Sequence, residues 1–314
     1  MTVINAMQFD SKSGGMVADS QGSSQLRKYD ISEKICYLNG SNGTKILLGG
    51  AGGSSTLYET RQRIAAKFPN EGSFRMSEVI SSLADIFNEL GRDIIDKEMH
   101  GRFGFGAHEY IAGRLADGTP IGQHLLAPVG EVYLGRDPEI KEARMNGFLA
   151  LGKDESGISL YCLPMGERPF LSPTPYGSIG SGRDESDKVL YGFVKNLPRD
   201  GRHSIDIVDG MAALIRATNR SSDINQGVGG IPTVAYFDDK KLVVLGENES
   251  LFATELVKVG DSGLVNIDVV KSGLGKLLGN TDSSLIEEEL FTNQPNSIEI
   301  MRFLRGYRLN GQKR

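Results

Sequence analysis

The order of local patterns along the chain is the feature that most constrains its fold. Strand-like apolar runs fill roughly the first fifty residues, two helical periods follow, and a second round of strands, helices and strands occupies 146–246. A parallel sheet needs a crossover, usually a helix, between successive strands, and this order lacks that alternation. We therefore predict an α+β fold in which antiparallel sheets are covered by pairs of helices.

The expected elements follow from apolar periodicity and turn residues. Strands are predicted at 2–9, 15–19, 33–38, 45–49, 146–152, 158–164, 231–237 and 241–246. Helices are predicted from 56 to 68, from 73 to 94, and at 182–196 and 203–219. The stretch from about 98 to 143 has weak periodicity, and the last seventy residues are expected to be mixed helix and loop.

Composition excludes several classes of protein. Glycine makes up 40 of 314 residues, about 13% against a usual ~7%, which indicates many tight turns. The net charge of −5 is opposite to that of a general nucleic-acid or anionic-membrane binder. Two cysteines exclude a disulfide framework, and no dinucleotide or phosphate-loop motif is present. We expect no metal, cofactor, nucleic-acid or membrane partner, and a cytoplasmic protein without a signal peptide.

Thr2 is the first candidate for chemistry. It follows the initiator Met1, and removal of that methionine would leave a threonine with a free amine. Its hydroxyl could then attack a carbonyl while its own amine takes the proton. The alternative is that a Met-Thr start has no functional meaning.

Further motifs accompany Thr2 in a fixed order. Val17-Ala18-Asp19 ends the second strand, Glu33-Lys34-Ile35 opens another, and Gly50-Ala51-Gly52-Gly53 leads into a helix. Phe148-Leu149-Ala150-Leu151-Gly152, Gly180-Ser181-Gly182 and Ala217-Thr218-Asn219-Arg220 with Asp223 follow downstream. This set resembles the proteasome β-subunit family of N-terminal-nucleophile (Ntn) hydrolases, over roughly 2–93 and 144–246.

The resemblance implies a four-layer αββα sandwich of two antiparallel sheets. Residues 1–246 would form this domain, with an insertion at about 94–143, and 247–314 would be a C-terminal extension. It also implies roles: Thr2 as nucleophile and, through its amine, as base; Lys34 as its electrostatic partner; Asp19 as the group that orients Lys34. The N–H of Gly52 would be the oxyanion donor, and Ser181 with Asp223 would organise the amine and a water. Gln226 stands where the family has a second serine.

The resemblance further implies a roomy, uncharged pocket for the residue before the scissile bond. Its lining would be Ser23, Ser32, Cys36, Gly50, Ser54 and Tyr58. None of these side chains is a carboxylate or a guanidinium, so neither basic nor acidic substrate residues would gain an ion pair there.

The predicted function is peptide-bond cleavage through an acyl ester on Thr2, with a peptide or unfolded protein as substrate. Homo-oligomeric assembly and an ATPase regulator are expected partners. Two alternatives stay open: a peptide ligase of the same family, and a non-catalytic ring or scaffold protein. Each site residue also has a structural alternative. Lys34 could be an exposed edge charge, and Ser181 could be a helix N-cap that Asp184 completes.

Overall fold

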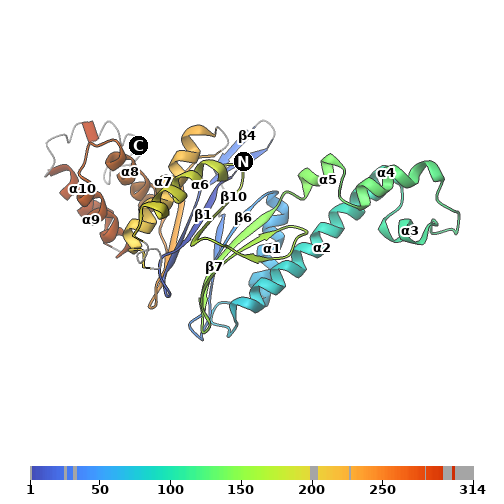
Figure 1. The fold of residues 1–314 in the computed structure, drawn as a ribbon, viewed down its shortest axis with the longest axis horizontal. Helices are drawn as coiled ribbons and strands as arrows, with labels where there is room; N and C mark the ends of the chain where they lie inside the picture. Colours follow the sequence, from blue (N-terminus) through green and yellow to red (C-terminus); the bar gives the residue numbers. More distant parts are fainter. Residues whose placement is uncertain are drawn as a thin grey trace.

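In the computed structural model, two five-stranded antiparallel sheets lie between layers of helices (Figure 1). The structure describes residues 2–24, 27–30, 34–198, 204–225, 228–279, 281–292 and 299–300. The first sheet has the order β10-β1-β2-β11-β12 and the second the order β5-β6-β7-β8-β9. The predicted α+β sandwich is confirmed.

The strands of the first sheet are β1 (Ile4–Gln8), β2 (Gly14–Ala18), β10 (Tyr176–Ile179), β11 (Thr233–Phe237) and β12 (Leu242–Val244). Those of the second are β5 (Ile35–Asn39), β6 (Lys45–Ala51), β7 (Gly147–Asp154), β8 (Gly157–Pro164) and β9 (Phe170–Leu171). A separate hairpin joins β3 (Gln21–Ser24) to β4 (Arg27–Asp30).

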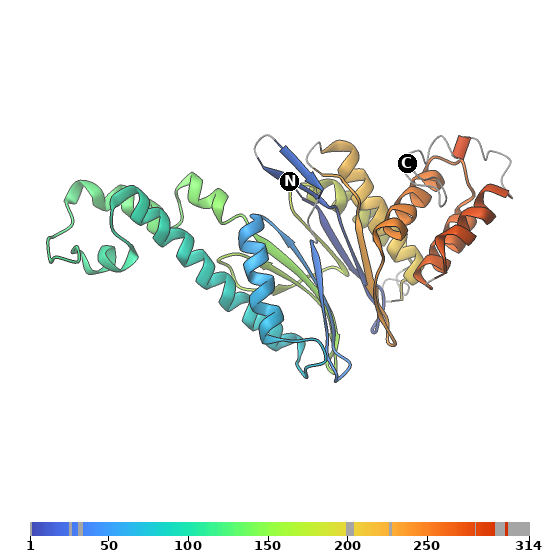
Figure 2. The ribbon, with the colours of Figure 1, turned by 180° about the vertical axis from the view of Figure 1, so that it is seen from behind.

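Helices cover both outer faces of the sandwich. On the second sheet lie α1 (Ser54–Lys67) and the first part of α2 (Met76–Phe103), which Figure 2 shows side by side. On the first sheet lie α6 (Arg183–Asn196) and α7 (Ile207–Ile224). The shorter helices in the middle of the chain are α3 (Ala107–Ala112), α4 (Gln123–Tyr133) and α5 (Pro138–Ala143).

Three apolar clusters hold the four layers together. The cluster between the two sheets includes the fully buried residues Ile4, Met16, Leu47, Leu149 and Phe237. Two further clusters fill the spaces between each sheet and its helices. Alternating strand residues supply both faces of each sheet, as a layered fold requires.

The second helix is longer than its apolar stripe predicted. It continues past Ile94 to Phe103 and carries α3 and α4 away from the sheets (Figures 1 and 2). This projecting part has its own small core, which includes Met99, Phe105, Val129 and Val132. We call the segment from the second half of α2 to α5 the arm.

The C-terminal part is helical. Helices α8 (Glu247–Asp261), α9 (Ile267–Leu278) and α10 (Ser283–Thr292) follow β12, and α8 and α9 contact α7. The buried residues of α8 and α9 share one apolar cluster with α7. The predicted division of the chain at residue 247 stays a prediction. Among the described residues, no helix combines the length and apolarity needed to cross a bilayer.

Candidate active site

Thr2 is held by the segment that joins β10 to α6. Its N–H donates to Ser181 Oγ, with the two atoms 3.1 Å apart, and its carbonyl oxygen accepts the N–H of Gly182 at 3.2 Å. Gly180 has φ +93°, and a Cβ built there would lie 2.1 Å from the Thr2 carbonyl oxygen. Only glycine fits this bend without a clash. The bend turns the chain after β10 so that the next residue, Ser181, lies against Thr2.

A buried ion pair lies one residue away from Thr2. Lys34 Nζ is 2.7 Å from Asp19 Oδ1 and 2.7 Å from the carbonyl oxygen of Gln21, and the side chains of Lys34 and Asp19 are only 5% and 2% exposed. Asp19 Oδ1 also accepts the N–H of Val3 at 2.8 Å. Lys34 is therefore not an exposed surface charge. Its partner Asp19 is hydrogen-bonded to Val3, the residue that follows Thr2.

Burial has the largest effect on the pKa of Asp19. It raises the pKa of the carboxyl above its ordinary value, while the Lys34 ammonium and the N–H groups of Val3 and Gly229 oppose that rise. Gly229 N–H reaches Asp19 Oδ2 at 3.3 Å, so both carboxylate oxygens have donors. These donors fix the orientation of the carboxylate, and with it the position of Lys34.

The turn between β6 and α1 exposes a backbone donor. Gly52 has φ +139°, and a Cβ there would collide with Asn146, whose Oδ1 accepts the N–H of Gly53 at 2.6 Å. The N–H of Gly52 has no hydrogen-bond partner among the residues that the structure describes. Asn146 thus accepts the N–H of Gly53 and leaves the N–H of Gly52 available to a ligand. Sequence patterns gave no sign of Asn146, because it precedes β7, far away in the chain.

Two serines behind Ser181 support its segment. Ser221 Oγ on α7 donates to the Gly182 carbonyl oxygen at 2.7 Å and lies 2.8 Å from Ser186 Oγ on α6. Both are fully buried. The N-cap of α6 is Gly182 without a side-chain cap, so the N-cap alternative for Ser181 is wrong.

Asp223 is not brought into this group. It is exposed in the last turn of α7, and no described residue forms a hydrogen bond or ion pair with it. Ser221, two residues earlier, makes the contact to the Ser181 segment instead. Gln226 lies outside the described residues.

The expected pocket residues lie around β5, β6 and α1. Cys36 is half-buried on β5, whereas Ser54 and Tyr58 are exposed on α1. Gly50 is buried, and a Cβ there would meet Phe148 at 2.8 Å and Leu57 at 2.9 Å. A larger residue at Gly50 would therefore push into the core under α1. Ser32 lies outside the described residues, and of Ser23, in β3, only the backbone is described.

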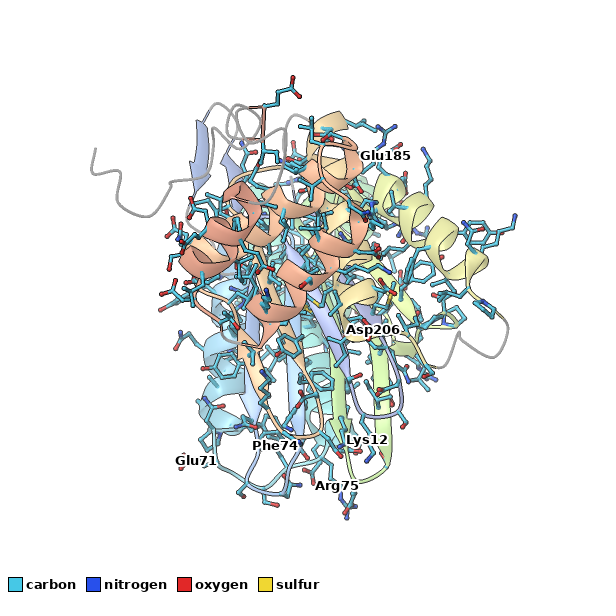
Figure 3. The ribbon with its side chains drawn as sticks, turned by 90° about the vertical axis from the view of Figure 1, so that its left-hand side faces the viewer. Lys12, Glu71, Phe74, Arg75, Glu185 and Asp206 are labelled. Atoms are coloured by element: carbon cyan, nitrogen blue, oxygen red, sulfur yellow. The ribbon has the colours of Figure 1, made fainter. Side chains whose placement is uncertain are left out.

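Figure 3 shows where the two ends of the sandwich lie. Lys12, Phe74 and Arg75 gather at one end, and Glu185 near the start of α6 lies at the other. The N-terminus and the β3-β4 hairpin lie at the α6 end (Figure 1). No group of three or more His, Cys, Asp or Glu among the described residues could hold a metal ion.

Two stacked antiparallel sheets between helix layers, with the first strand starting at Ile4, form the fold of Ntn hydrolases. Solved structures of Anbu proteins are similar. The Anbu (ancestral beta-subunit) from Yersinia bercovieri has a TM-score of 0.55 and 12% identity, over 94% of this chain and 99% of that one. A mutant of Anbu from Hyphomicrobium sp. strain MC1 has a TM-score of 0.52 and 11% identity, over 77% and 85% of the two chains. No family model and no curated protein matches the sequence.

These findings correct the family assignment made from sequence motifs. The assignment to the proteasome β-subunit family is wrong, because no family model matches and the similar structures are Anbu proteins at 11–12% identity. Such identity establishes the fold alone. The motifs consist largely of glycine bends and strand ends, which Gly52 and Gly180 illustrate. A backbone of this shape needs them whatever the family.

Proposed function

We propose that the chain is a threonine-type Ntn hydrolase that cleaves peptide bonds through an acyl ester on Thr2 after removal of Met1. The observation that supports this most is the set of polar contacts at Thr2 and Val3. Ser181 contacts the Thr2 nitrogen, and the buried Lys34–Asp19 pair is hydrogen-bonded to the N–H of Val3. In addition, the N–H of Gly52 in the β6–α1 turn has no partner among the described residues.

The chemistry would begin with the free amine. An α-amine titrates near ~8, and the Lys34 ammonium would favour its neutral, basic form. The Thr2 amine takes the hydroxyl proton as Oγ1 bonds to the substrate carbonyl carbon. The carbonyl oxygen becomes an oxyanion, which the N–H of Gly52 stabilises. The C–N bond then breaks, and the leaving nitrogen takes the proton from the Thr2 ammonium. Water, activated by the same amine, hydrolyses the ester and restores Thr2.

The test is labelling of the N-terminus. Intact mass should show loss of Met1, and a β-lactone or vinyl-sulfone probe should add its mass to the peptide that begins with Thr2. Thr2→Ala should abolish labelling because it removes the hydroxyl alone, and Thr2→Ser should keep part of it. Thr119→Ala, on the arm, is the matched control and should label like the parent.

The outcomes separate the open alternatives. Labelling that persists in Thr2→Ala would place the nucleophile elsewhere. Retained Met1 without labelling would favour a scaffold. If added amines take the acyl group faster than water does, the chain is a ligase. The "ancestral beta-subunit" description of the Yersinia structure supports assembly of several copies, which native mass would test.

A further inference from the structure

A cavity along β10 and α6 plays no part in the proposed chemistry. This cavity has a volume of about 510 Å³ and lies between β8, β10 and α6. Its lining residues are Cys162, Ser172, Thr174, Tyr176, Gly177, Ser178, Arg183, Asp184, Asp187, Lys188 and Tyr191. We call it the β10 cavity.

Three of the four charged side chains in this lining already have partners. Arg183 Nε lies 3.6 Å from Asp184 Oδ1. Lys188 Nζ lies 2.5 Å from the carboxylate of Glu185. Asp187 is half-buried and forms no ion pair within the described part of the chain. The β10 cavity therefore presents one carboxylate whose charge no neighbour within ion-pair distance neutralises.

A buried hydroxyl in the same cavity also lacks a partner. Ser178 on β10 is 8% exposed, and its Oγ makes no hydrogen bond with the described residues. Burial raises the pKa of Asp187, while the nearby Ser178 hydroxyl, as a donor to the carboxylate outside good hydrogen-bond geometry, and the Arg183 guanidinium lower it. Ser172 and Thr174, by contrast, both donate to the Tyr176 carbonyl oxygen. A donor placed between Ser178 and Asp187 would satisfy both groups.

The thiol and the phenol of the wall carry no negative charge at neutral pH. Burial and the Asp187 carboxylate raise the pKa of the Cys162 thiol and that of the Tyr176 phenol. Both side chains are thus neutral, and Asp187 is the lining carboxylate without an ion pair in the described part of the chain, although the Arg183 guanidinium lies near enough to lower its pKa. A half-buried carboxylate without an ion-pair partner favours a cationic ligand with several N–H donors.

We propose that the β10 cavity binds a primary ammonium group of the substrate peptide, with Asp187 as its counter-ion and Ser178 as a hydrogen-bond acceptor. This rests on the proposed function, because β10 continues through Gly180 to Ser181, which contacts Thr2. Ser178 precedes Ser181 by three residues, which span at most ~10 Å. The ammonium would therefore lie within about three peptide residues of the scissile bond, which makes peptides with a lysine or a free amino terminus within that distance the preferred substrates.

Binding can be measured without turnover. Three probes share one skeleton: Nα-acetyl-lysine N-methylamide offers a side-chain ammonium, norleucine N-methylamide an α-ammonium, and Nα-acetyl-norleucine N-methylamide none. NMR titration of the full chain should show shifts at the amides of Gly177 and Ser178 with one or both ammonium probes and none with the third. Asp187→Asn should weaken binding at least about tenfold, which corresponds to ~1.4 kcal/mol. Ser178→Ala should weaken it less.

The control for charge is Asp117→Asn, which removes a carboxylate on the arm and should bind the probes like the parent. Equal shifts with all three probes, or unchanged affinity in Asp187→Asn, would overturn the proposal. Turnover separates it from the proposed function. If Thr2 is labelled but lysine and norleucine peptides have equal kcat/KM, only the ammonium site fails. If Thr2 is never labelled, the NMR result still decides the site.

Discussion

At the residue scale, we expect Lys34 to be the most sensitive position of the candidate site. Its buried ammonium donates hydrogen bonds to Asp19 and to the Gln21 carbonyl oxygen. We expect Lys34→Ala to lower kcat/KM by at least ~10², comparable to the loss of one transition-state electrostatic partner. The buried Asp19 charge left behind should lower the free energy of unfolding by about 3–5 kcal/mol.

Lys34→Arg should not rescue activity, because a planar guanidinium cannot take the position of a compact ammonium. Lys67→Ala, at the end of α1, provides the matched removal of an exposed lysine. Peptide turnover and urea unfolding measure the two effects. Near-parental turnover in Lys34→Ala would remove Lys34 from the mechanism.

The raised pKa of Asp19 predicts a pH-dependent stability. The folded carboxyl holds its proton to a higher pH than the unfolded one, which titrates near ~3.9. Stability from this group is therefore full below about pH 3.9 and is lost as pH rises through the folded pKa. In urea unfolding, the free energy of unfolding of the parent should fall relative to that of Asp19→Asn as the pH rises from about 3.9 through the folded pKa of Asp19.

Asp117→Asn should show the opposite pH dependence: the free energy of unfolding of the parent should rise relative to that of the variant as the pH rises, because hydrogen bonds from Thr119 lower the pKa of Asp117. A pH-independent difference for Asp19→Asn would mean that Lys34 fully offsets the burial of the carboxyl.

Sequence patterns predicted some of the residues that the structure brings together in the candidate site. Thr2, Asp19, Lys34 and Ser181 were singled out, and the structure brings them together around the first strand. Ser221 and Asn146 were missed because each acts through hydrogen bonds to residues distant in the chain. Such contacts leave no periodic trace in a single sequence.

At the element scale, the bend between β10 and α6 should be sensitive to one methyl group. Gly180→Ala forces a left-handed φ and places a Cβ against the Thr2 carbonyl oxygen. We expect loss of most labelling at Thr2 and destabilisation by at least ~1 kcal/mol. Gly192→Ala on α6 is the control, since nothing lies within 4 Å of its added Cβ. Its stability should be unchanged or rise, as alanine favours a helix. Equal behaviour of the two variants would contradict the role of this bend.

The strand β10 itself was not predicted. Its four residues, Tyr176–Ile179, include a glycine and a serine and follow a proline-rich stretch, so they show no apolar alternation. Their pairing with β1 spans more than 160 residues of chain. The hairpins β7-β8 and β5-β6 were predicted because their partners are neighbours joined by turn residues. Local signals therefore predicted these two hairpins and missed the edge strand that leads to Ser181.

At the scale of the whole molecule, the separate core of the arm predicts separate stability. Met99 is fully buried in the arm, and Met16 is fully buried between the sheets. Each Met→Ala change should lower the stability of the core that contains it by about 2–5 kcal/mol. Met99→Ala should raise amide exchange in α4 while β1 and β2 stay protected. Met16→Ala should destabilise the sandwich and abolish labelling at Thr2. Faster exchange of β1 in Met99→Ala would show that arm and sandwich unfold together.

The arm also sets how the molecule occupies space. A helix of 28 residues is about 42 Å long, and the outer part of α2 stands clear of the sheets (Figure 1). The chain therefore tumbles as an elongated body, with a hydrodynamic radius larger than its mass alone would give. In any assembly of copies, the arm acts as a spacer: neighbours that meet on this side are held apart by its reach unless they lie alongside it.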